Sequence, residues 1–151
     1  MVTFISGPDR REAIAREILE ALPDWFGIAE SREAYIRESR GHPFWADLED
    51  GAARGFLALK ETSPYTAELA VMGVLPEHHR QGVGRELFAV FRQYAKAQGY
   101  EYLQVKTVRK GCYAAYDGTN AFYQSVGFRE LECFPSLWDE RNPCQIYVMA
   151  I

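Results

Sequence analysis

The stretch Val74-Leu75-Pro76-Glu77-His78-His79-Arg80-Gln81-Gly82-Val83-Gly84-Arg85 decides how this chain of 151 residues folds. An apolar run ends before Pro76, and the glycines Gly82 and Gly84 open a periodic segment that reaches about Gln98. The pattern predicts a buried strand, a tight loop and a long helix. The first N–H groups of a helix lack intrahelical partners and carry positive partial charge, so this arrangement suits phosphate or pyrophosphate.

Two familiar phosphate-binding motifs do not fit this stretch. A dinucleotide fingerprint needs a third glycine at the position that Leu87 occupies. A P-loop needs a Gly-Lys-Ser/Thr sequence, which is absent. Taken alone, Gly-x-Gly is a weak signal, because a glycine-containing turn before any helix has the same pattern.

Hydrophobic periodicity and turn residues place the other elements around this stretch. We expect helices over Asp9–Leu22, from Ser31 as N-cap to about Arg40, from about Gly82 to Gln98, and over Thr119–Ser125. We expect strands over Val2–Ser6, Pro43–Asp50, Ala52–Thr62, Thr66–Leu75, Tyr102–Val108, Phe128–Cys133 and Gln145–Ile151. Residues 24–27, residues 111–118 and the segment with Trp138 and Pro143 are expected to be loops.

The order of these elements predicts a single mixed α/β domain over residues 1–151. A right-handed crossover through the long helix would make the strands at 66–75 and 102–108 parallel. Gly73, near the end of the first of them, suits a bulge or a close approach to the backbone.

Composition and charge exclude several classes of function. Apolar residues make up 48% of the chain, which is typical of a globular protein rather than a disordered one. The 17 basic and 21 acidic residues give a net charge of −4, which argues against nucleic acid as the main partner. No apolar run is long enough for a membrane span, and the first residues lack the features of a signal peptide. Cys112, Cys133 and Cys144 lack metal-ligand spacing, so we expect a cytoplasmic protein with reduced thiols and no metal.

Two motifs together resemble those of a known family. His79-Arg80-Gln81-Gly82-Val83-Gly84 resembles the coenzyme A signature of the GNAT superfamily of N-acetyltransferases, Gln/Arg-x-x-Gly-x-Gly/Ala, and departs from it at His79. The segment Asn120–Phe128 resembles the later family motif Phe-Tyr-x-x-x-Gly-Phe. The likeness extends from about Ala52 to Ile151. It implies a mixed, splayed β-sheet of about seven strands flanked by helices, with acetyl-coenzyme A entering between the strands at 66–75 and 102–108.

The resemblance also implies roles for individual residues. Tyr123 would protonate the leaving thiolate, and Glu68 would take the proton of the amine, although an outward-facing, non-catalytic Glu68 is an open alternative. The Val74 amide could polarise the acetyl carbonyl. The residues implied to bind acetyl-coenzyme A are Met72, Val74, His79, Arg80, Gln81, Gly82, Val83, Gly84, Arg85, Asn120 and Tyr123. No cysteine is placed as a nucleophile, so we expect direct transfer without a covalent enzyme intermediate.

The motifs leave the acceptor open. A primary amine of a small molecule or a peptide fits the family. The amino group of a protein N-terminus or of a lysine is a further possible acceptor. Aromatic residues that could line the acceptor site are Trp25, Phe26, Tyr35, Phe44, Trp45 and Trp138. Glu30, Glu33 and Asp47 could attract a cationic amine, and Lys106 and Arg109 could meet an acidic group or lie in solvent.

Two further interpretations remain open on the sequence. A catalytically inactive sensor that binds coenzyme A would need the same glycine loop, so Gly82 and Gly84 do not distinguish it from an enzyme. The resemblance also implies a possible homodimer, since members of the family are often dimers, and the strand from Gln145 could pair across such an interface.

Overall fold

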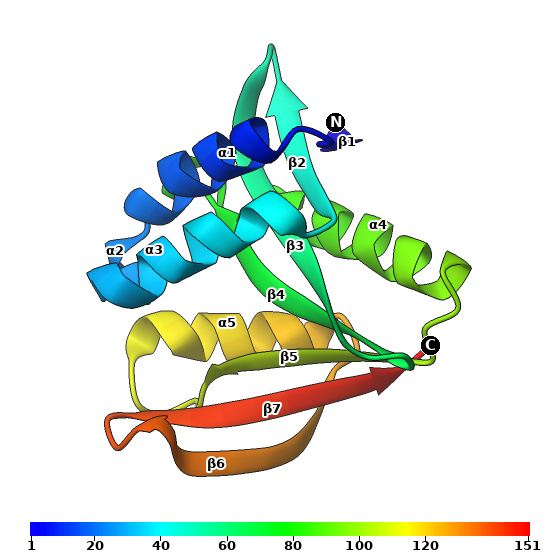
Figure 1. The fold of residues 1–151 in the computed structure, drawn as a ribbon. Helices are drawn as coiled ribbons and strands as arrows, with labels where there is room; N and C mark the ends of the chain where they lie inside the picture. Colours follow the sequence, from blue (N-terminus) through cyan, green and yellow to red (C-terminus); the bar gives the residue numbers. More distant parts are fainter. The chain divides into compact units, whose positions relative to one another are not determined.

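The computed structural model describes residues 1–151 and contains a mixed seven-stranded sheet (Figure 1). The strands are β1 (Val2–Phe4), β2 (Phe44–Glu49), β3 (Ala52–Ser63), β4 (Thr66–Val74), β5 (Tyr102–Val108), β6 (Arg129–Asp139) and β7 (Asn142–Ala150). The helices are α1 (Pro8–Glu20), α2 (Pro23–Phe26), α3 (Ala29–Glu38), α4 (Val83–Ala97) and α5 (Ala114–Ser125), with 3-10 turns η1 (Ser39–Gly41) and η2 (Pro76–His78). The strand order is β1-β2-β3-β4-β5-β7-β6, and β4 and β5 are parallel. The predicted mixed α/β fold and parallel pair are confirmed.

Two compact units share these elements. The first comprises Met1–Lys60 and Ala70–Tyr94, and the second comprises Glu61–Leu69 and Ala95–Ile151. The boundary passes through β4, whose first half pairs with β5 inside the second unit. This strand therefore supplies backbone to both units.

The core of the first unit is formed by α1 and the strands beside it. Ile14, Ile18 and Leu19 recur at helical spacing and are buried. Phe44 of β2 and Phe56 of β3 are fully buried and stack with their ring centroids 5.0 Å apart. Each such side chain contributes about 1.5–3 kcal/mol to stability when it is fully buried.

Gly73 of β4 lets helix α1 approach the sheet. A Cβ atom at this position would lie 2.9 Å from Ile18 Cγ2 and 3.0 Å from Leu22 Cδ1, and real Cβ contacts are essentially never shorter than 3.0 Å. The close approach that the sequence suggested at this glycine is therefore made by Ile18 of α1 and by Leu22, which follows the helix. The missing side chain serves packing within the first unit.

The long helix α4 follows the predicted amphipathic pattern. Leu87 and Phe91 are fully buried, and Tyr94 contacts Trp45 edge-on with ring centroids 5.0 Å apart. None of the helices combines the length and the apolar character that a membrane span requires.

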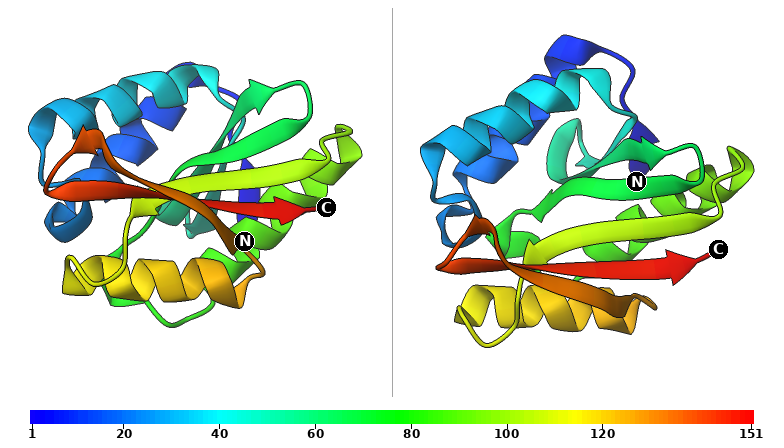
Figure 2. Two further views of the ribbon diagram at one scale, coloured as in Figure 1. Left: turned by 90° about the horizontal axis from the view of Figure 1, so that it is seen from below. Right: turned by 60° about the horizontal axis from the view of Figure 1, so that its bottom comes forward.

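The second unit is built on the antiparallel strands β5, β7 and β6 together with helix α5 (Figure 2). β7 pairs with β5 along its whole Tyr102–Val108 length and with β6 on its other side. Both edges of β7 are thus occupied, so the expected pairing of the strand from Gln145 across a homodimer interface is wrong. The sheet ends at β6.

Helix α5 is longer than the sequence predicted, because residues 114–118 are helical rather than loop. Its first turn closes where Asp117 N donates to Tyr113 O at 3.2 Å. Asp117 Oδ1 also accepts a hydrogen bond from Gly111 N at 2.7 Å, which ties the preceding loop to this turn. Gly118, which suggested a break, is accommodated in the interior of the helix.

Two elements near the N-terminus also differ from expectation. The loop expected at 24–27 is mostly the short helix α2, since Pro23 at the first helical position carries a φ suited to a helix. Helix α3 begins two residues before Ser31, and Arg32 N donates to Ile28 O at 2.9 Å. Ser31 therefore lies inside the first turn and is not the N-cap.

The last hairpin is longer than predicted. β6 continues to Asp139 and β7 starts at Asn142, so Trp138 and Pro143 lie in strands rather than in a loop. The pairing between these strands has register shifts at Glu130/Glu132 and between Phe134 and Asp139, and such irregularity obscures a strand in the sequence.

The close packing at Gly73 leads to a stability prediction. Gly73→Ala should lower the free energy of unfolding by about 1–3 kcal/mol, because the added methyl group meets α1. Gly118→Ala is the matched control: no atom lies within 4 Å of its added Cβ and the site is helical, so it should stabilise by about 0.5–1 kcal/mol. Urea unfolding of both variants measures the difference, and equal effects at the two sites would contradict the packing argument.

Candidate active site

In the first unit, the loop between β4 and α4 has an unusual backbone. After the 3-10 turn η2, Arg80 has φ of 62° and Gly82 has φ of 83°. A left-handed conformation is ordinary for glycine but costs roughly 1–2 kcal/mol for a residue such as arginine. Glu86 N donates to Gly82 O at 3.0 Å, which closes the first turn of α4. N–H groups before that point lack acceptors inside a helix and face its N-terminal end.

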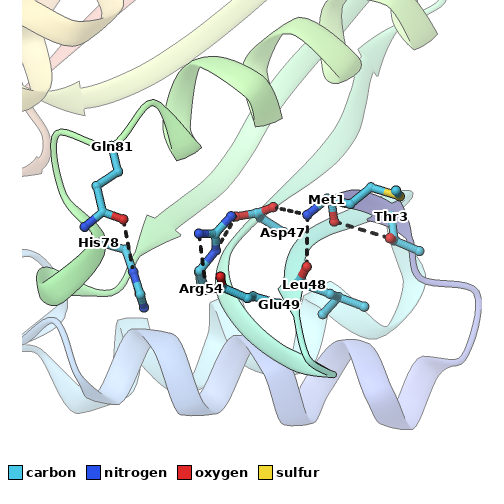
Figure 3. A network of polar contacts seen from close by, with 8 residues as sticks. All are labelled: Met1, Thr3, Asp47, Leu48, Glu49, Arg54, His78 and Gln81. Atoms are coloured by element: carbon cyan, nitrogen blue, oxygen red, sulfur yellow. Dashed lines mark hydrogen bonds and ion pairs between the residues drawn. The ribbon is translucent and has the colours of Figure 1, made fainter.

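Side chains within the loop hold it in place. His79 Nε2 donates to Val74 O at 2.7 Å and so fastens the loop to the end of β4. The imidazole also meets Trp25 of α2 edge-on, with ring centroids 5.8 Å apart. Gln81 Nε2 donates to Glu77 O at 3.1 Å, and its Oε1 lies 3.3 Å from His78 Nδ1 (Figure 3). The residue that departs from the family signature, His79, thus has a structural role that a histidine ring can fill.

In the half of β4 that leads into this loop, successive side chains alternate between the two faces of the strand. Val71 and Gly73 are buried, whereas Met72 and Val74 are half-buried on the opposite face. The segment Met72–Val74 ends β4 and leads directly into the loop.

In the second unit, Glu68 of β4 is buried with only 7% of its surface exposed. Its Oε1 accepts a hydrogen bond from Gln104 Nε2 at 2.8 Å and lies 3.2 Å from Lys106 Nζ. Glu68 stands opposite Gln104 in the parallel register, and Lys106 is two residues further on the same face of β5. Lys106, for which solvent or an acidic ligand was expected, is the ion-pair partner of Glu68.

Asn120 of α5 is held in a buried network of the second unit. Its Nδ2 donates to Val108 O at 2.9 Å and to Tyr116 O at 2.7 Å. Its Oδ1 accepts a 2.6 Å hydrogen bond from the hydroxyl of Tyr147, and Gln124 Nε2 donates to the same hydroxyl at 3.4 Å. Burial raises the pKa of Tyr147, with the hydrogen bond from Gln124 acting in the opposite direction. The Asn120 side chain, expected to bind acetyl-coenzyme A, is 1% exposed and links α5 to β5 and β7.

Tyr123 lies on the same helix, and its ring is packed among aromatic rings. The rings of Phe122, Phe128 and Tyr147 lie at 5.8, 5.8 and 6.2 Å, and 7% of Tyr123 is exposed. Sequence reasoning missed Tyr147, although it lies in the strand predicted from Gln145. Its burial beneath α5 could have been suspected from the continuous apolar run at residues 146–151, which is typical of a buried strand.

The candidate acceptor residues divide by their surroundings. Phe44 and Trp45 belong to the core, and Trp138 lies 42% exposed on β6. The side chains of Trp25, Phe26 and Tyr35 are partly buried against the core of the first unit.

Two of the acidic candidates, Glu33 and Asp47, are engaged within the protein, whereas Glu30 is exposed. Arg16 donates to both oxygens of Glu33 at 2.9 Å, and these hydrogen bonds lower the pKa of Glu33. Asp47 is buried and accepts hydrogen bonds from the Met1 amino group at 2.8 Å and from Arg54 Nε at 2.7 Å (Figure 3). Burial acts to raise the pKa of Asp47, but these hydrogen bonds outweigh it and the pKa is lowered.

Neither a metal centre nor an activated thiol is apparent in the structure. No group of three or more His, Cys, Asp or Glu side chains is arranged to hold a metal ion. Cys112 is exposed, Cys133 is half-buried and Cys144 is buried, all as free thiols. Burial raises the pKa of Cys144 to about 11, which makes it a poor nucleophile at neutral pH.

Known structures share this architecture. A protein assigned to the GNAT family of acetyltransferases from Desulfovibrio desulfuricans is 19% identical, with a TM-score of 0.82 over 99% of this chain and 98% of its own. The ribosomal-protein-S18-alanine N-acetyltransferase of Escherichia coli is 20% identical, with a TM-score of 0.76 over 100% of this chain and 94% of its own. A GNAT family acetyltransferase of Elizabethkingia anophelis with acetyl-CoA bound is 18% identical, with a TM-score of 0.69 over 90% of each chain.

These structural likenesses establish the fold, and no curated protein matches the sequence significantly. The decisive match is to a family model. The model of the acetyltransferase (GNAT) family matches residues 11–128, which include the glycine loop and the motif that ends at Phe128. The match covers well over half of the chain and spans parts of both compact units. The chain therefore belongs to the GNAT family of acetyltransferases, and is an acyltransferase.

Proposed function

We propose that residues 1–151 form one N-acetyltransferase domain that moves the acetyl group of acetyl-coenzyme A directly to a primary amine of a small molecule or peptide. The observation that carries this proposal is the loop from His79 to Arg85. Its left-handed residues Arg80 and Gly82 bring the chain to the N-terminus of α4, where backbone N–H groups and the helix dipole favour the pyrophosphate of coenzyme A. Arg80 and Arg85 add positive charge beside it.

The other donor contacts in this proposal come from β4. Backbone groups at Met72 and Val74 would pair with the pantetheine arm, and the Val74 amide would polarise the acetyl carbonyl. The His79 hydrogen bond occupies the Val74 carbonyl, so it positions the end of β4 relative to the loop without using the amide. Asn120 would contribute by holding α5 in place, because its side chain is engaged inside the second unit.

The chemical step needs two proton transfers. The amine nitrogen attacks the thioester carbonyl carbon, a C–N bond forms, and the C–S bond breaks. In this proposal Glu68 takes the proton that the amine loses, and Tyr123 gives a proton to the departing thiolate. Positioning of the two substrates supplies most of the remaining rate enhancement.

The proposed acceptor is an amine, and its identity is open. The Escherichia coli neighbour acts on an alanine of ribosomal protein S18, and another structural neighbour is an aminoglycoside 6'-N-acetyltransferase. These names support amine acceptors in general, from a peptide N-terminus to a sugar. The partly buried aromatic side chains Trp25, Phe26 and Tyr35 are our candidates for the acceptor side. The free thiols Cys112, Cys133 and Cys144 support a reducing compartment such as the cytoplasm.

A pair of variants at Gly82 tests the donor site. The Cβ at this position points into open space, and the positive φ is similarly strained for Asp and Asn. Gly82→Asp and Gly82→Asn should therefore unfold at similar temperatures without ligand. Because only aspartate places a negative charge beside the pyrophosphate, it should weaken acetyl-coenzyme A binding on the order of tenfold more than asparagine.

The measurement is thermal unfolding with and without acetyl-coenzyme A, since a ligand at 100 times its Kd stabilises by about 2.7 kcal/mol. The wild-type protein should show a clear rise in melting temperature. No rise with acetyl-coenzyme A or free coenzyme A would overturn the donor site. Thiol release with a panel of amines then identifies the acceptor class.

Two neighbouring tyrosines separate catalysis from stability. Tyr123→Phe should lower kcat by about 10²-fold or more, because the leaving thiolate loses its proton donor. The rise in melting temperature with acetyl-coenzyme A should remain. Tyr147→Phe removes the hydroxyl that donates to Asn120 and should lower stability by about 1–3 kcal/mol with a much smaller effect on kcat. Equal kcat values for the two variants would exclude Tyr123 as the acid.

Glu68 is tested against its ion-pair partner. Glu68→Gln keeps the size of the side chain but removes its basicity, and kcat should fall by about 10²-fold or more if this carboxylate takes the proton. Lys106→Met breaks the same ion pair but retains the carboxylate, so it should keep more activity. Equal losses of kcat and stability in both variants would show that Glu68 serves only as the partner of Lys106.

A further inference from the structure

Three polar side chains of the second unit project from the same face of the sheet. Glu68 of β4 is paired with Gln104 of β5, and Lys106 lies two residues further along β5. Side chains two residues apart on a strand point to the same face. We call these three residues the Glu68 cluster. In it, Glu68 Oε1 is 2.8 Å from Gln104 Nε2 and 3.2 Å from Lys106 Nζ.

Helix α5 packs against the other face of these strands. Tyr147 of β7 donates a hydrogen bond to Asn120 of α5 and so marks the face that the helix covers. The preceding residue, Ile146, stands opposite Lys106 and points to the opposite face. The Lys106 side chain is 34% exposed there. The cluster therefore lies beside an apolar residue on the face that α5 leaves open.

The cluster contains polar atoms that the protein leaves without a partner. Glu68 Oε2 and Gln104 Oε1 accept no hydrogen bond, and Lys106 Nζ has three N–H donors but only Glu68 as its ion-pair partner. The one fully enclosed side-chain N or O atom without a hydrogen-bond partner is Nε of Arg32, so the atoms of the cluster are open to contact. A ligand would meet a carboxylate, an amide oxygen and an ammonium group side by side.

The charges of the cluster indicate which kind of amine it accepts. A simple aliphatic amine is an ammonium ion at neutral pH, so beside Glu68 and Lys106 it would place two cations against one carboxylate. If Glu68 takes a proton from that amine, Lys106 loses its counter-ion, and an uncompensated charge in a partly buried site is unfavourable. An acceptor with its own carboxylate balances the charges both before and after the proton moves.

The geometry of the ion pair favours an acceptor whose amine and acidic group are close together. Glu68 Oε1 and Lys106 Nζ are only 3.2 Å apart. In an α-amino acid the amino group and the carboxylate are bonded to the same carbon atom. Such a molecule, lying antiparallel to the ion pair, sets its ammonium against Glu68 and its carboxylate against Lys106.

We propose that the acceptor is a free α-amino acid, and that Lys106 selects it by binding its carboxylate. This inference rests on the proposed acetyl transfer with Glu68 as the base. When Glu68 takes the proton, the carboxylate of the acceptor replaces that of Glu68 as the counter-ion of Lys106. The amine is then neutral and can attack the thioester. Lys106 is thus a specificity-determining residue of the acceptor site.

Matched acceptors test this selection. Glycine, serine, leucine and phenylalanine are each compared with their amide and with the amine that lacks the carboxyl group, by thiol release from acetyl-coenzyme A. For at least one amino acid, kcat/KM should exceed the values of both analogues on the order of tenfold or more. Amides are weaker bases and supply more free amine at neutral pH, so intrinsic reactivity acts against this preference.

The two proposals fail in different ways. Acetylation of the amides or plain amines as fast as of every amino acid would overturn the inference and leave acetyl transfer to amines intact. No thiol release with any amine would overturn the proposed function, and this inference with it.

The residue is tested by variants of Lys106, with Lys96→Met as the matched control. Lys96 is exposed in the last turn of α4 and forms no ion pair. Lys106→Met should lower the ratio of kcat/KM for the amino acid to that for its amide on the order of tenfold, mainly through the KM of the amino acid. Lys106→Arg retains the charge and should keep part of the preference, and Lys96→Met should keep all of it.

This ratio does not depend on how much of the enzyme is folded, so a purely structural role of Lys106 would not change it. An unchanged ratio in Lys106→Met would overturn the assignment. The distance is tested with 6-aminohexanoate, whose carboxylate is separated from the amine by a long chain. It should be acetylated no better than pentylamine, and a preference as large as that for the α-amino acid would overturn the antiparallel placement.

Discussion

Within the second unit, Thr66–Leu69 of β4 pair in parallel with Tyr102–Val105 of β5. The donor site that we propose depends on the rest of this strand, because a strand that runs straight into the glycine loop fixes where that loop begins. The following residues of β4 continue to Val74, where the His79 hydrogen bond fastens the strand to the glycine loop. Strand end, loop and helix start thus form one continuous segment, and each constrains the conformation of the next.

The buried polar side chains of the second unit are held in two ways, by a neutral hydrogen-bonded network around Asn120 and by an ion pair at Glu68. Asn120 and Tyr147 satisfy each other in a buried network, and an unmade hydrogen bond there would cost about 1–3 kcal/mol. Glu68 is also buried, but its partners Gln104 and Lys106 lie on the neighbouring strand β5. The network holds α5 against β5 and β7, and such rigidity would suit Tyr123, the proton donor that we propose on the same helix.

The sequence predicted the elements whose signals are local and regular. Strand β5 has its predicted bounds, and the hairpin of β2 and β3 turns where Gly51 indicated. The start of α5 was missed because Gly118 resembles a break, whereas a helix can contain one glycine when its flanks are anchored. The ion pair of Glu68 with Lys106 was missed because it depends on the register of two strands, which no local pattern specifies. The burial of Asn120 depends in the same way on packing between distant segments.

The buried thiol of Cys144 gives the protein an uneven sensitivity to oxidants. Reaction with peroxide requires a thiolate, and a pKa of about 11 leaves little of it at neutral pH. The exposed Cys112 lies in the loop before α5 and can be oxidised without opening the core. Oxidation would therefore begin at the exposed Cys112, where it leaves the packing of β7 intact. The protein can then remain folded after its first side chains have been oxidised.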